Sequence, residues 1–326
     1  MPATSSRMTA QPPAAVSTPL SEIMLRAVSA AARVYFQRMP SRLGKTALWE
    51  RVVRPYLAWR PLEIEARLRC GARLHGRLDD LIHRFAYFFG VFEPAVTAVF
   101  ETTLRPGDVV IDIGANVGAH TLLAARLVGP TGRVHAIEAS PWIFERLQAN
   151  LARNHAVNVT AYNLAVTDRP GPVQVFLHDT SNRGGTTILP GEAAHRATTP
   201  EAVVEGLPLG DIVPTDALRT ARLIKIDVEG AEWLVAQGLR AALPLLRQDV
   251  TLLIEVTPQA LAAFGATPGD FLRLFTAHGF AAFAVPNRYD PGFYIDPPDG
   301  PALRPLARED FEATDILFRR PAPGTG

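Results

Sequence analysis

Residues 108–118, which read DVVIDIGANVG, constrain the fold more than any other stretch of the chain. A short apolar run without polar alternation is typical of a parallel strand that is buried on both faces. Gly114 and Gly118 follow it, where the strand passes into a helical segment; without side chains they let the backbone bend and let a ligand approach it. The free N–H groups of the new helix point at the same place. The segment therefore predicts a nucleotide-type pocket at the carboxyl end of a first parallel strand.

The spacing within this loop argues against a dinucleotide. Asn116 stands where the G-x-G-x-x-G fingerprint has its second glycine, which lets a pyrophosphate approach the backbone. Glu138 ends the next apolar segment, and its distance from Gly114 is close to the roughly 20 residues expected for an acid that binds a ribose diol. An unphosphorylated ribose beside the acidic Asp112 favours S-adenosylmethionine (SAM), whose sulfonium is positively charged. The alternative is a tight turn with a structural role only.

A second group of charged residues lies in residues 223–232, LIKIDVEGAE. Lys225 and Asp227 share one face of a strand, about 7 Å apart along it. A lysine inside an apolar strand needs a carboxylate partner, and Asp227, Asp112 and Glu255 are the candidates. Such charges at the carboxyl edge of an apolar sheet predict an active site, although an ion pair that only braces the sheet is the alternative.

Composition excludes several kinds of site. Lys plus Arg number 33 against 32 Asp plus Glu, and a net charge of +1 offers no electrostatic footprint for nucleic acid. The only cysteine, Cys70, rules out an internal disulfide and a Cys-based zinc site, and it suits a reducing cytoplasm. No apolar run reaches the about 18 residues of a membrane span. We expect a cytoplasmic protein without a transmembrane segment; a homo-oligomer is compatible with the sequence.

The chain is expected to have four parts. Residues 1–19, rich in Ala, Pro, Ser and Thr, predict a disordered tail, and residues 321–326 predict a second one. Residues 20–100 predict an N-terminal extension that consists of an amphipathic helix, a β-hairpin and a lid over the pocket. In residues 101–320 strands alternate with helices, which predicts a doubly wound, mostly parallel α/β sheet. Residues 178–207 within it are expected to form a long loop that shapes the pocket.

Three motifs together resemble the FkbM family of SAM-dependent methyltransferases: VIDIGANVG at 110–118, GRVHAIE at 132–138 and IKIDVEGAE at 224–232. The resemblance covers roughly residues 62–318. It implies a Rossmann-like class I methyltransferase fold with a seven-stranded sheet, and methylation of hydroxyl groups on sugars, polyketides or other natural products. One departure is Ala139, where the family usually has a proline; this loosens the turn but leaves Glu138 available.

The resemblance also implies roles for individual residues. Those assigned to the amino-acid half of SAM are Asp112, Gly114, Asn116 and Gly118. Glu138 is assigned to the ribose, and Ala165 and Asp168 to the surroundings of the adenine. Those that lie towards the acceptor are Asp227, Lys225 and Glu229.

Several alternatives remain open at this point. The acceptor proton could go to Asp227 or to a histidine, and His120 could face either the pocket or the solvent. No metal ligand is assigned, with a Mg²⁺ ion between Asp227 and Glu255 as the alternative. An RNA methyltransferase and a non-catalytic SAM-binding protein of the same fold are the rival functions. An oxidoreductase is disfavoured by Asn116 in the glycine loop.

Overall fold

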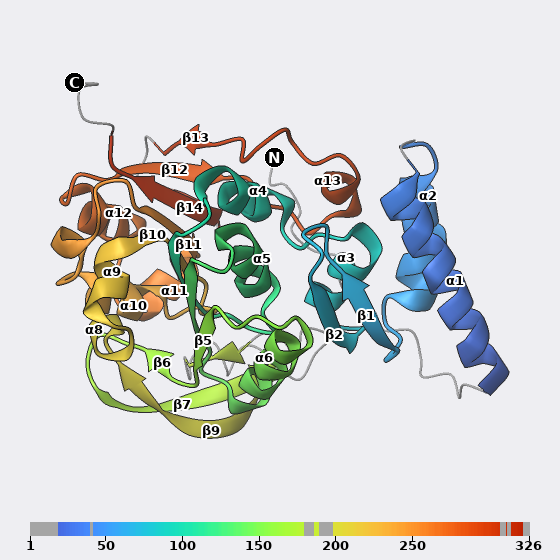
Figure 1. Ribbon diagram of the computed structural model, residues 1–326, viewed down its shortest axis with the longest axis horizontal. Coiled ribbons are helices and arrows are strands. Elements are labelled where there is room, and N and C mark those ends of the chain that lie inside the picture. The colour runs from blue at the N-terminus through green and yellow to red at the C-terminus, as the bar shows by residue number, and fades with distance from the viewer. Residues whose placement is uncertain are drawn as a thin grey trace.

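A mostly parallel β-sheet lies at the centre of the computed structural model, which describes residues 19–39, 42–178, 186–188, 198–306, 311 and 314–321 (Figure 1). Its strands, in spatial order, are β13 (Arg304–Pro305), β12 (Ala281–Val285), β14 (Thr314–Arg319), β11 (Thr251–Val256), β10 (Ala221–Ile226), β3 (Val109–Ile113), β4 (Arg133–Ile137) and β5 (Val159–Tyr162). The five strands from β11 to β5 are parallel, and β14 runs antiparallel to both β11 and β12. The predicted α/β class is confirmed.

The expected number of strands is wrong by one. The described sheet has eight strands instead of seven, because β13 pairs antiparallel with β12 at the edge. A strand of two residues has no alternating pattern by which a sequence could reveal it. Its Pro305 is tolerated because an edge strand needs to pair on one side only.

The two faces of the sheet are covered by different helices, and alternate residues of each strand face different layers. Helices α4 (Pro94–Thr103) and α5 (Ala119–Val128) cover the face that carries Val110, Leu223 and Leu253. The opposite face packs against α8 (Leu209–Ile212), α9 (Thr215–Thr220), α10 (Glu232–Leu239), η2 (Leu243–Leu245), α11 (Pro258–Ala263) and α12 (Pro268–Thr276). The sheet is therefore buried on both sides, as its apolar strands predict.

The segments before the sheet share a core with it. They are α1 (Pro19–Arg38), α2 (Lys45–Leu48), the π-helix η1 (Trp49–Leu57), the hairpin β1 (Glu63–Arg67) and β2 (Arg73–Arg77), and α3 (Leu81–Phe89). The expected amphipathic helix and hairpin are confirmed, and α3 ends at Gly90, whose φ of 72° suits a glycine. Phe36, Trp49 and Phe88 belong to one apolar cluster with Val117 and Leu147 from beyond residue 100. The division at residue 100 stays a prediction, and α4 runs across it.

At residues 178–207, where a long loop was expected, the described residues belong largely to strands of a second, smaller sheet, and for these residues the expectation of a loop is wrong. Its strands, in spatial order, are β6 (Ala165–Val166), β9 (Thr198–Leu207), β7 (Gly171–His178) and β8 (Thr186–Thr187). Eight of the ten residues of β9 pair antiparallel with β7, with a register shift at Glu201, and Figure 1 shows the pair running beneath α6 (Pro141–Arg153). The single third strand expected at residues 157–166 is divided between the two sheets, as β5 and β6. The glycine-rich residues 181–185 and His195 lie outside the described residues.

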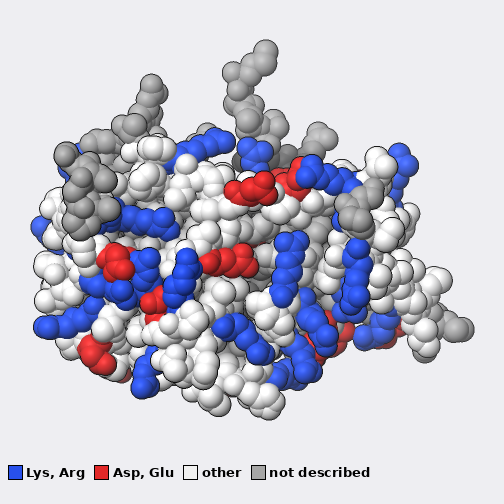
Figure 2. Space-filling view, turned by 45° about the horizontal axis from the view of Figure 1, so that its top comes forward, with Lys and Arg blue, Asp and Glu red and all other residues white. Residues whose placement is uncertain are grey.

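Charged side chains are spread over the surface. On the face shown in Figure 2, basic side chains extend across the whole width and acidic ones lie beside several of them. Across the described ranges, no helix has both the length and the apolarity needed to cross a bilayer.

Candidate active site

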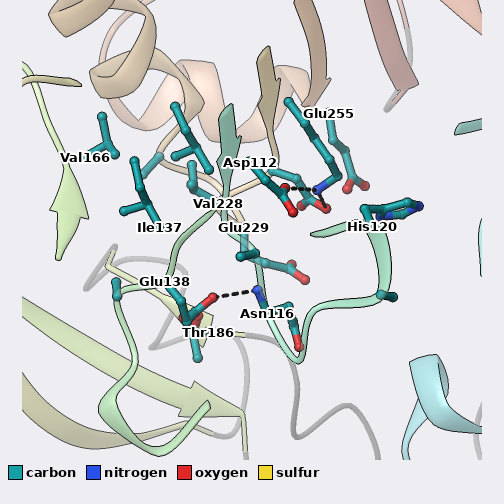
Figure 3. Close-up of a pocket in the computed structure, with 18 of the residues that line it drawn as sticks. Asp112, Asn116, His120, Ile137, Glu138, Val166, Thr186, Val228, Glu229 and Glu255 are labelled. Carbon is teal, nitrogen blue, oxygen red and sulfur yellow. Dashed lines mark hydrogen bonds and ion pairs between the residues drawn. The ribbon is translucent and has the colours of Figure 1, made fainter. Parts of the chain in front are cut away.

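A cavity of about 270 Å³ opens at the carboxyl ends of β3, β4, β10 and β11, close to the lower limit of about 300 Å³ for small-molecule sites. It has two chemically different ends (Figure 3). The glycine-loop end is lined by Gly114, Ala115, Asn116, Ile137, Glu138, Leu164, Ala165, Val166 and Thr186. The carboxylate end is lined by Glu93, Asp112, His120, Lys225, Asp227, Glu255 and Tyr289.

Glycine is required at position 114 by close backbone packing. Its φ is 77°, and a Cβ atom placed there would lie 1.7 Å from the carbonyl oxygen of Asp227. The N–H groups of Gly114 and Ala115 donate to the Ile137 carbonyl, at 2.9 and 3.0 Å, which joins the loop to β4. The loop thereby lies directly against the end of β10, and its backbone lines the cavity.

Gly118, by contrast, has a structural position. It precedes α5 with a φ of 93°, and a Cβ atom there would lie 2.8 Å from Leu147 Cδ1. It is absent from the described cavity lining, whereas Asn116 belongs to that lining and adopts a φ of 51°. The structure therefore brings Gly114 and Asn116 to the cavity and assigns Gly118 to the packing of α5 on α6.

Glu138 is held at the glycine-loop end by two backbone donors. Asn116 N–H donates to Oε2 and Ser140 N–H donates to Oε1, both at 2.9 Å. The side chain is buried, and burial raises the pKa of Glu138 to about 7 in spite of these two donors. The carboxyl group is thus fixed in orientation, and each oxygen keeps a further lone pair for a ligand in the cavity.

The two residues assigned to the adenine differ in position. Ala165 lines the cavity beside Leu164 and Val166, which together offer an apolar surface. Asp168 is absent from the described lining; its carboxylate lies 3.9 Å from the Arg169 guanidinium and its side chain is 32% exposed. It belongs to the turn between β6 and β7.

The period of two in the strands brings the charged residues to one face. Asp112, Lys225 and Glu255 lie two residues beyond Val110, Leu223 and Leu253, and so on the α4–α5 face of the sheet. Lys225 pairs in register with Asp112. The sequence therefore predicted this grouping correctly.

Lys225 forms an ion pair with two carboxylates. Its Nζ donates to Asp227 Oδ2 at 2.9 Å and lies 3.9 Å from Asp112 Oδ1. Burial lowers the pKa of Lys225, but the carboxylates of Asp227, Asp112 and Glu93 outweigh it, and the net shift is upward. Burial raises the pKa of Asp227, but Lys225 outweighs it and the net shift is downward. Lys225 and Asp227 are therefore charged at neutral pH.

The two acids after β10 have separate functions. Glu232, the first residue of α10, accepts hydrogen bonds from Gly230 N–H (2.9 Å) and Val228 N–H (3.3 Å) and so holds the turn. Glu229 adopts a φ of 52° and lines the cavity. Of the two, Glu229 lines the cavity, and its role towards the acceptor stays a prediction.

Four residues that line or adjoin the carboxylate end lie outside the site residues assigned from the sequence, which had left the orientation of one of them, His120, open. Glu93 is buried before α4, accepts a hydrogen bond from the Tyr289 hydroxyl and lies 3.6 Å from His120 Nε2. His120 is buried and faces the cavity, with its ring between Phe92 and Phe100. Asp315 pairs in register with Glu255 across β14 and β11. An acidic residue within an apolar strand could have identified Asp315 from the sequence, whereas no feature of the sequence distinguishes Tyr289.

Crowding of carboxyl groups changes their protonation. Burial, with Asp315 and Asp227 nearby, raises the pKa of Glu93 to about 8, and burial with Asp227 raises that of Asp315 to about 7. The charge of Asp227 raises the pKa of Glu255 well above its usual value. Burial and then Lys225 lower the pKa of His120 to about 3, so its imidazole is neutral.

Within the described chain, no group of three or more His, Cys, Asp or Glu side chains has the arrangement of a metal site.

Comparison with known proteins identifies the family of the chain. The family model described as "Methyltransferase FkbM domain" matches residues 112–281, about half of the chain. The chain belongs to the FkbM methyltransferase family. A relative in this family is a 31-O-demethyl-FK506 methyltransferase of Streptomyces tacrolimicus, 32% identical over 208 residues, which are 56% of this chain and 75% of the relative.

Other similarities cover less sequence or are weaker. An arsenite methyltransferase of Halobacterium salinarum is 38% identical over 56 residues, 17% of this chain and 14% of the relative. Among solved structures, a precorrin-6y C5,15-methyltransferase of Geobacter metallireducens covers 70% of this chain and 86% of its own, with 18% identity and a TM-score of 0.40.

Proposed function

We propose that this member of the FkbM methyltransferase family transfers a methyl group from SAM to a hydroxyl group of a small, polar molecule. The observation that carries the proposal is the juxtaposition of the two ends of one cavity. A fixed carboxyl group beside a glycine loop suits a ribose, and a buried set of carboxyl groups lines the other end of the same cavity (Figure 3).

The residues of the glycine-loop end fit SAM. The backbone at Gly114 leaves space that any Cβ would remove, Glu138 has acceptor capacity for a ribose diol, and Ala165 belongs to an apolar surface suited to adenine. Asp112 Oδ2 accepts a hydrogen bond from the Thr121 hydroxyl at 2.6 Å. Its other oxygen, Oδ1, is buried and has no hydrogen-bond partner within the described residues. This oxygen lies 3.9 Å from Lys225 Nζ, too far for a hydrogen bond, and can accept one from the amino group of SAM.

The chemistry of the reaction needs mainly alignment and a proton acceptor. When bound, SAM supplies an electrophilic methyl group on a good leaving group. The protein then has to orient the acceptor oxygen and remove its proton. Asp227 is ionised, and Lys225 fixes its orientation, so Asp227 is the residue that we assign to the hydroxyl proton. Neutral His120 is placed to hold the acceptor by a hydrogen bond through Nε2.

The acceptor is expected to be neutral or cationic and rich in hydroxyl groups. Five carboxyl groups and one lysine line this part of the cavity or its middle. The pKa values of Glu93 and Glu255 are raised, so these two groups can donate hydrogen bonds to hydroxyl groups, while Asp227 is ionised and the positive charge of Lys225 is already paired. The site therefore offers an anionic acceptor no free positive charge. The Streptomyces relative is named a 31-O-demethyl-FK506 methyltransferase, which favours an alcohol acceptor. Sugars and polyketides are the classes that we propose.

Calorimetric titration with SAM is the first test, followed by incubation of the protein with methyl-labelled SAM and a panel of methyl glycosides and polyketide alcohols. We expect saturable SAM binding, and labelled product with alcohols but not with carboxylate or phosphate acceptors. Absence of SAM binding would end the proposal. Binding together with transfer to an amine or a thiol would overturn the assignment of the acceptor alone.

A further inference from the structure

Glu201 connects the small sheet to the start of α6. It lies in β9, and its carboxylate accepts hydrogen bonds from Ser140 Oγ–H and Trp142 N–H, both at 2.7 Å. The first turn of a helix leaves N–H groups without partners inside the helix. In α6 Pro141 has none to offer, Ser140 Oγ accepts from Ile143 N–H (3.1 Å), and Glu201 supplies the acceptor for Trp142. A negative charge at this helix end is also favoured by the macrodipole.

The same serine leads directly to the carboxyl group of the cavity. Ser140 is fully buried, and while its hydroxyl donates to Glu201, its N–H donates to Glu138 Oε1. A continuous chain of hydrogen bonds thus runs from Glu201 through Ser140 to Glu138 and on to Asn116. Strand β9 is joined to β7, and the neighbouring β8 brings Thr186 to the cavity lining. One hydrogen-bond network therefore connects the small sheet with the carboxyl group of Glu138.

Resting on the SAM site proposed above, we propose that Glu201 is a positioning residue for the cofactor: it holds Ser140, and through it Glu138, and it links cofactor binding to the small sheet. Nothing in the sequence motifs points to it, because it lies in a segment that reads as a loop. Within the described residues its side chain accepts hydrogen bonds from the start of α6, so it acts on the cofactor through Ser140 and through its charge on Glu138.

Because Glu201 is charged, its loss should change the pH dependence of cofactor binding, an effect that a purely structural contact would not have. Burial is the main reason that the pKa of Glu138 is raised; the backbone donors of Ser140 and Asn116 lower it, and the charges of Glu201 and Asp112 raise it. Protonated Glu138 loses acceptor capacity for a diol, so cofactor affinity should fall as the pH falls through this pKa. Removal of the Glu201 charge should therefore move the acid limb of the affinity profile to lower pH.

The experiment is calorimetric titration with S-adenosylhomocysteine between pH 5.5 and 8.5. Glu201→Gln keeps an acceptor oxygen, so we expect nearly unchanged affinity at pH 8.5 and an acid limb at lower pH. Glu201→Ala should bind about 5- to 10-fold more weakly at pH 8.5, the effect of roughly one lost hydrogen bond. Glu205→Gln, an exposed residue of the same strand, is the matched control and should match the wild type.

The outcomes separate this proposal from the one on which it rests. If the wild type does not bind S-adenosylhomocysteine, the SAM site itself is wrong. If the wild type binds and Glu201→Ala lowers only the melting temperature, with affinity and pH profile unchanged, Glu201 merely caps α6 and the proposal is overturned. In a Glu138→Gln background, the Glu201→Gln change should no longer move the profile; a shift that persists would also overturn it.

Discussion

The two ends of the cavity are built in opposite ways. At the glycine-loop end the loop is held by backbone hydrogen bonds, and apart from Thr186 its residues come from short segments that follow one another in the chain, 114–116, 137–138 and 164–166. At the carboxylate end the contacts are between side chains, from residues as distant as Glu93, Lys225 and Tyr289. The glycine-loop end is formed by the path of the backbone, whereas the carboxylate end is formed by charged side chains from distant parts of the chain.

This difference indicates which kinds of substitution each end of the cavity should tolerate. The glycine-loop end depends on the path of the backbone, so its function should survive changes of charge around it better than changes of shape. The carboxylate end depends on the balance between one lysine and several carboxyl groups in a buried place, where an unpaired charge is costly. Each of the following predictions tests one side of this contrast.

The largest effect is expected from Asp227→Ala, which should separate the two ends most clearly. Turnover should fall about 10²- to 10⁴-fold, as for the loss of a general base, while SAM affinity should change little. Labelled methyl transfer and calorimetric titration measure the two quantities. Asp211→Ala, at an exposed position, is the control. A parallel loss of SAM affinity would show that the two ends are not separable.

Lys225→Met should destabilise the protein strongly, because it removes the cation that pairs with Asp112 and Asp227. Breaking a buried ion pair costs about 3–5 kcal/mol in the free energy of unfolding, measured in urea. Lys45→Met is the comparison: Lys45 donates to the Phe36 carbonyl, and its loss should cost about 1 kcal/mol. Equal losses for the two variants would mean that the carboxylates near Lys225 are neutral without it.

Glu138→Ala tests the glycine-loop end. The loss of a charged acceptor for the ribose diol should weaken SAM binding by about 10- to 100-fold, equivalent to roughly 1.5–3 kcal/mol, without abolishing the fold. Calorimetry gives the affinity, and thermal melting checks that the protein remains folded. Unchanged affinity would mean that Glu138 supports the loop through Asn116 and does not touch the ribose.

The smallest effect is a fall in stability as the pH rises. A carboxyl group whose pKa is higher in the folded than in the unfolded state stabilises the fold most at pH values below its unfolded pKa. This contribution is lost as the pH rises through the folded pKa, which is about 8 for Glu93 and about 7 for Asp315. Between pH 7 and 9 we expect Glu93 to account for about 1 kcal/mol of lost unfolding free energy. Urea titrations of the wild type and Glu93→Gln measure it. The variant should show a flatter profile, and a profile that keeps its slope would contradict the assignment to Glu93.

The sequence predicted whatever depends on short stretches of chain. The order of strands and helices, the bend at Gly114, the place of Glu138 and the shared face of Asp112, Lys225 and Glu255 all follow from local pattern and from the period of two in strands. Pairing between distant segments left no such pattern, which is why β13 and β9 were missed, and with them the contact of Glu201 with α6.

Tertiary structure alone decided the acid–base character of the site. Asp227 and Glu255 are ordinary carboxylates in the printed sequence, yet one has its pKa lowered and the other raised, because Lys225 pairs with the first and the charge of the first acts on the second. Burial, and then the charge of Lys225, lowers the pKa of His120 to about 3, so its imidazole stays neutral in acid as well. Distances and loss of water set these properties, and neither is encoded in any single stretch of residues.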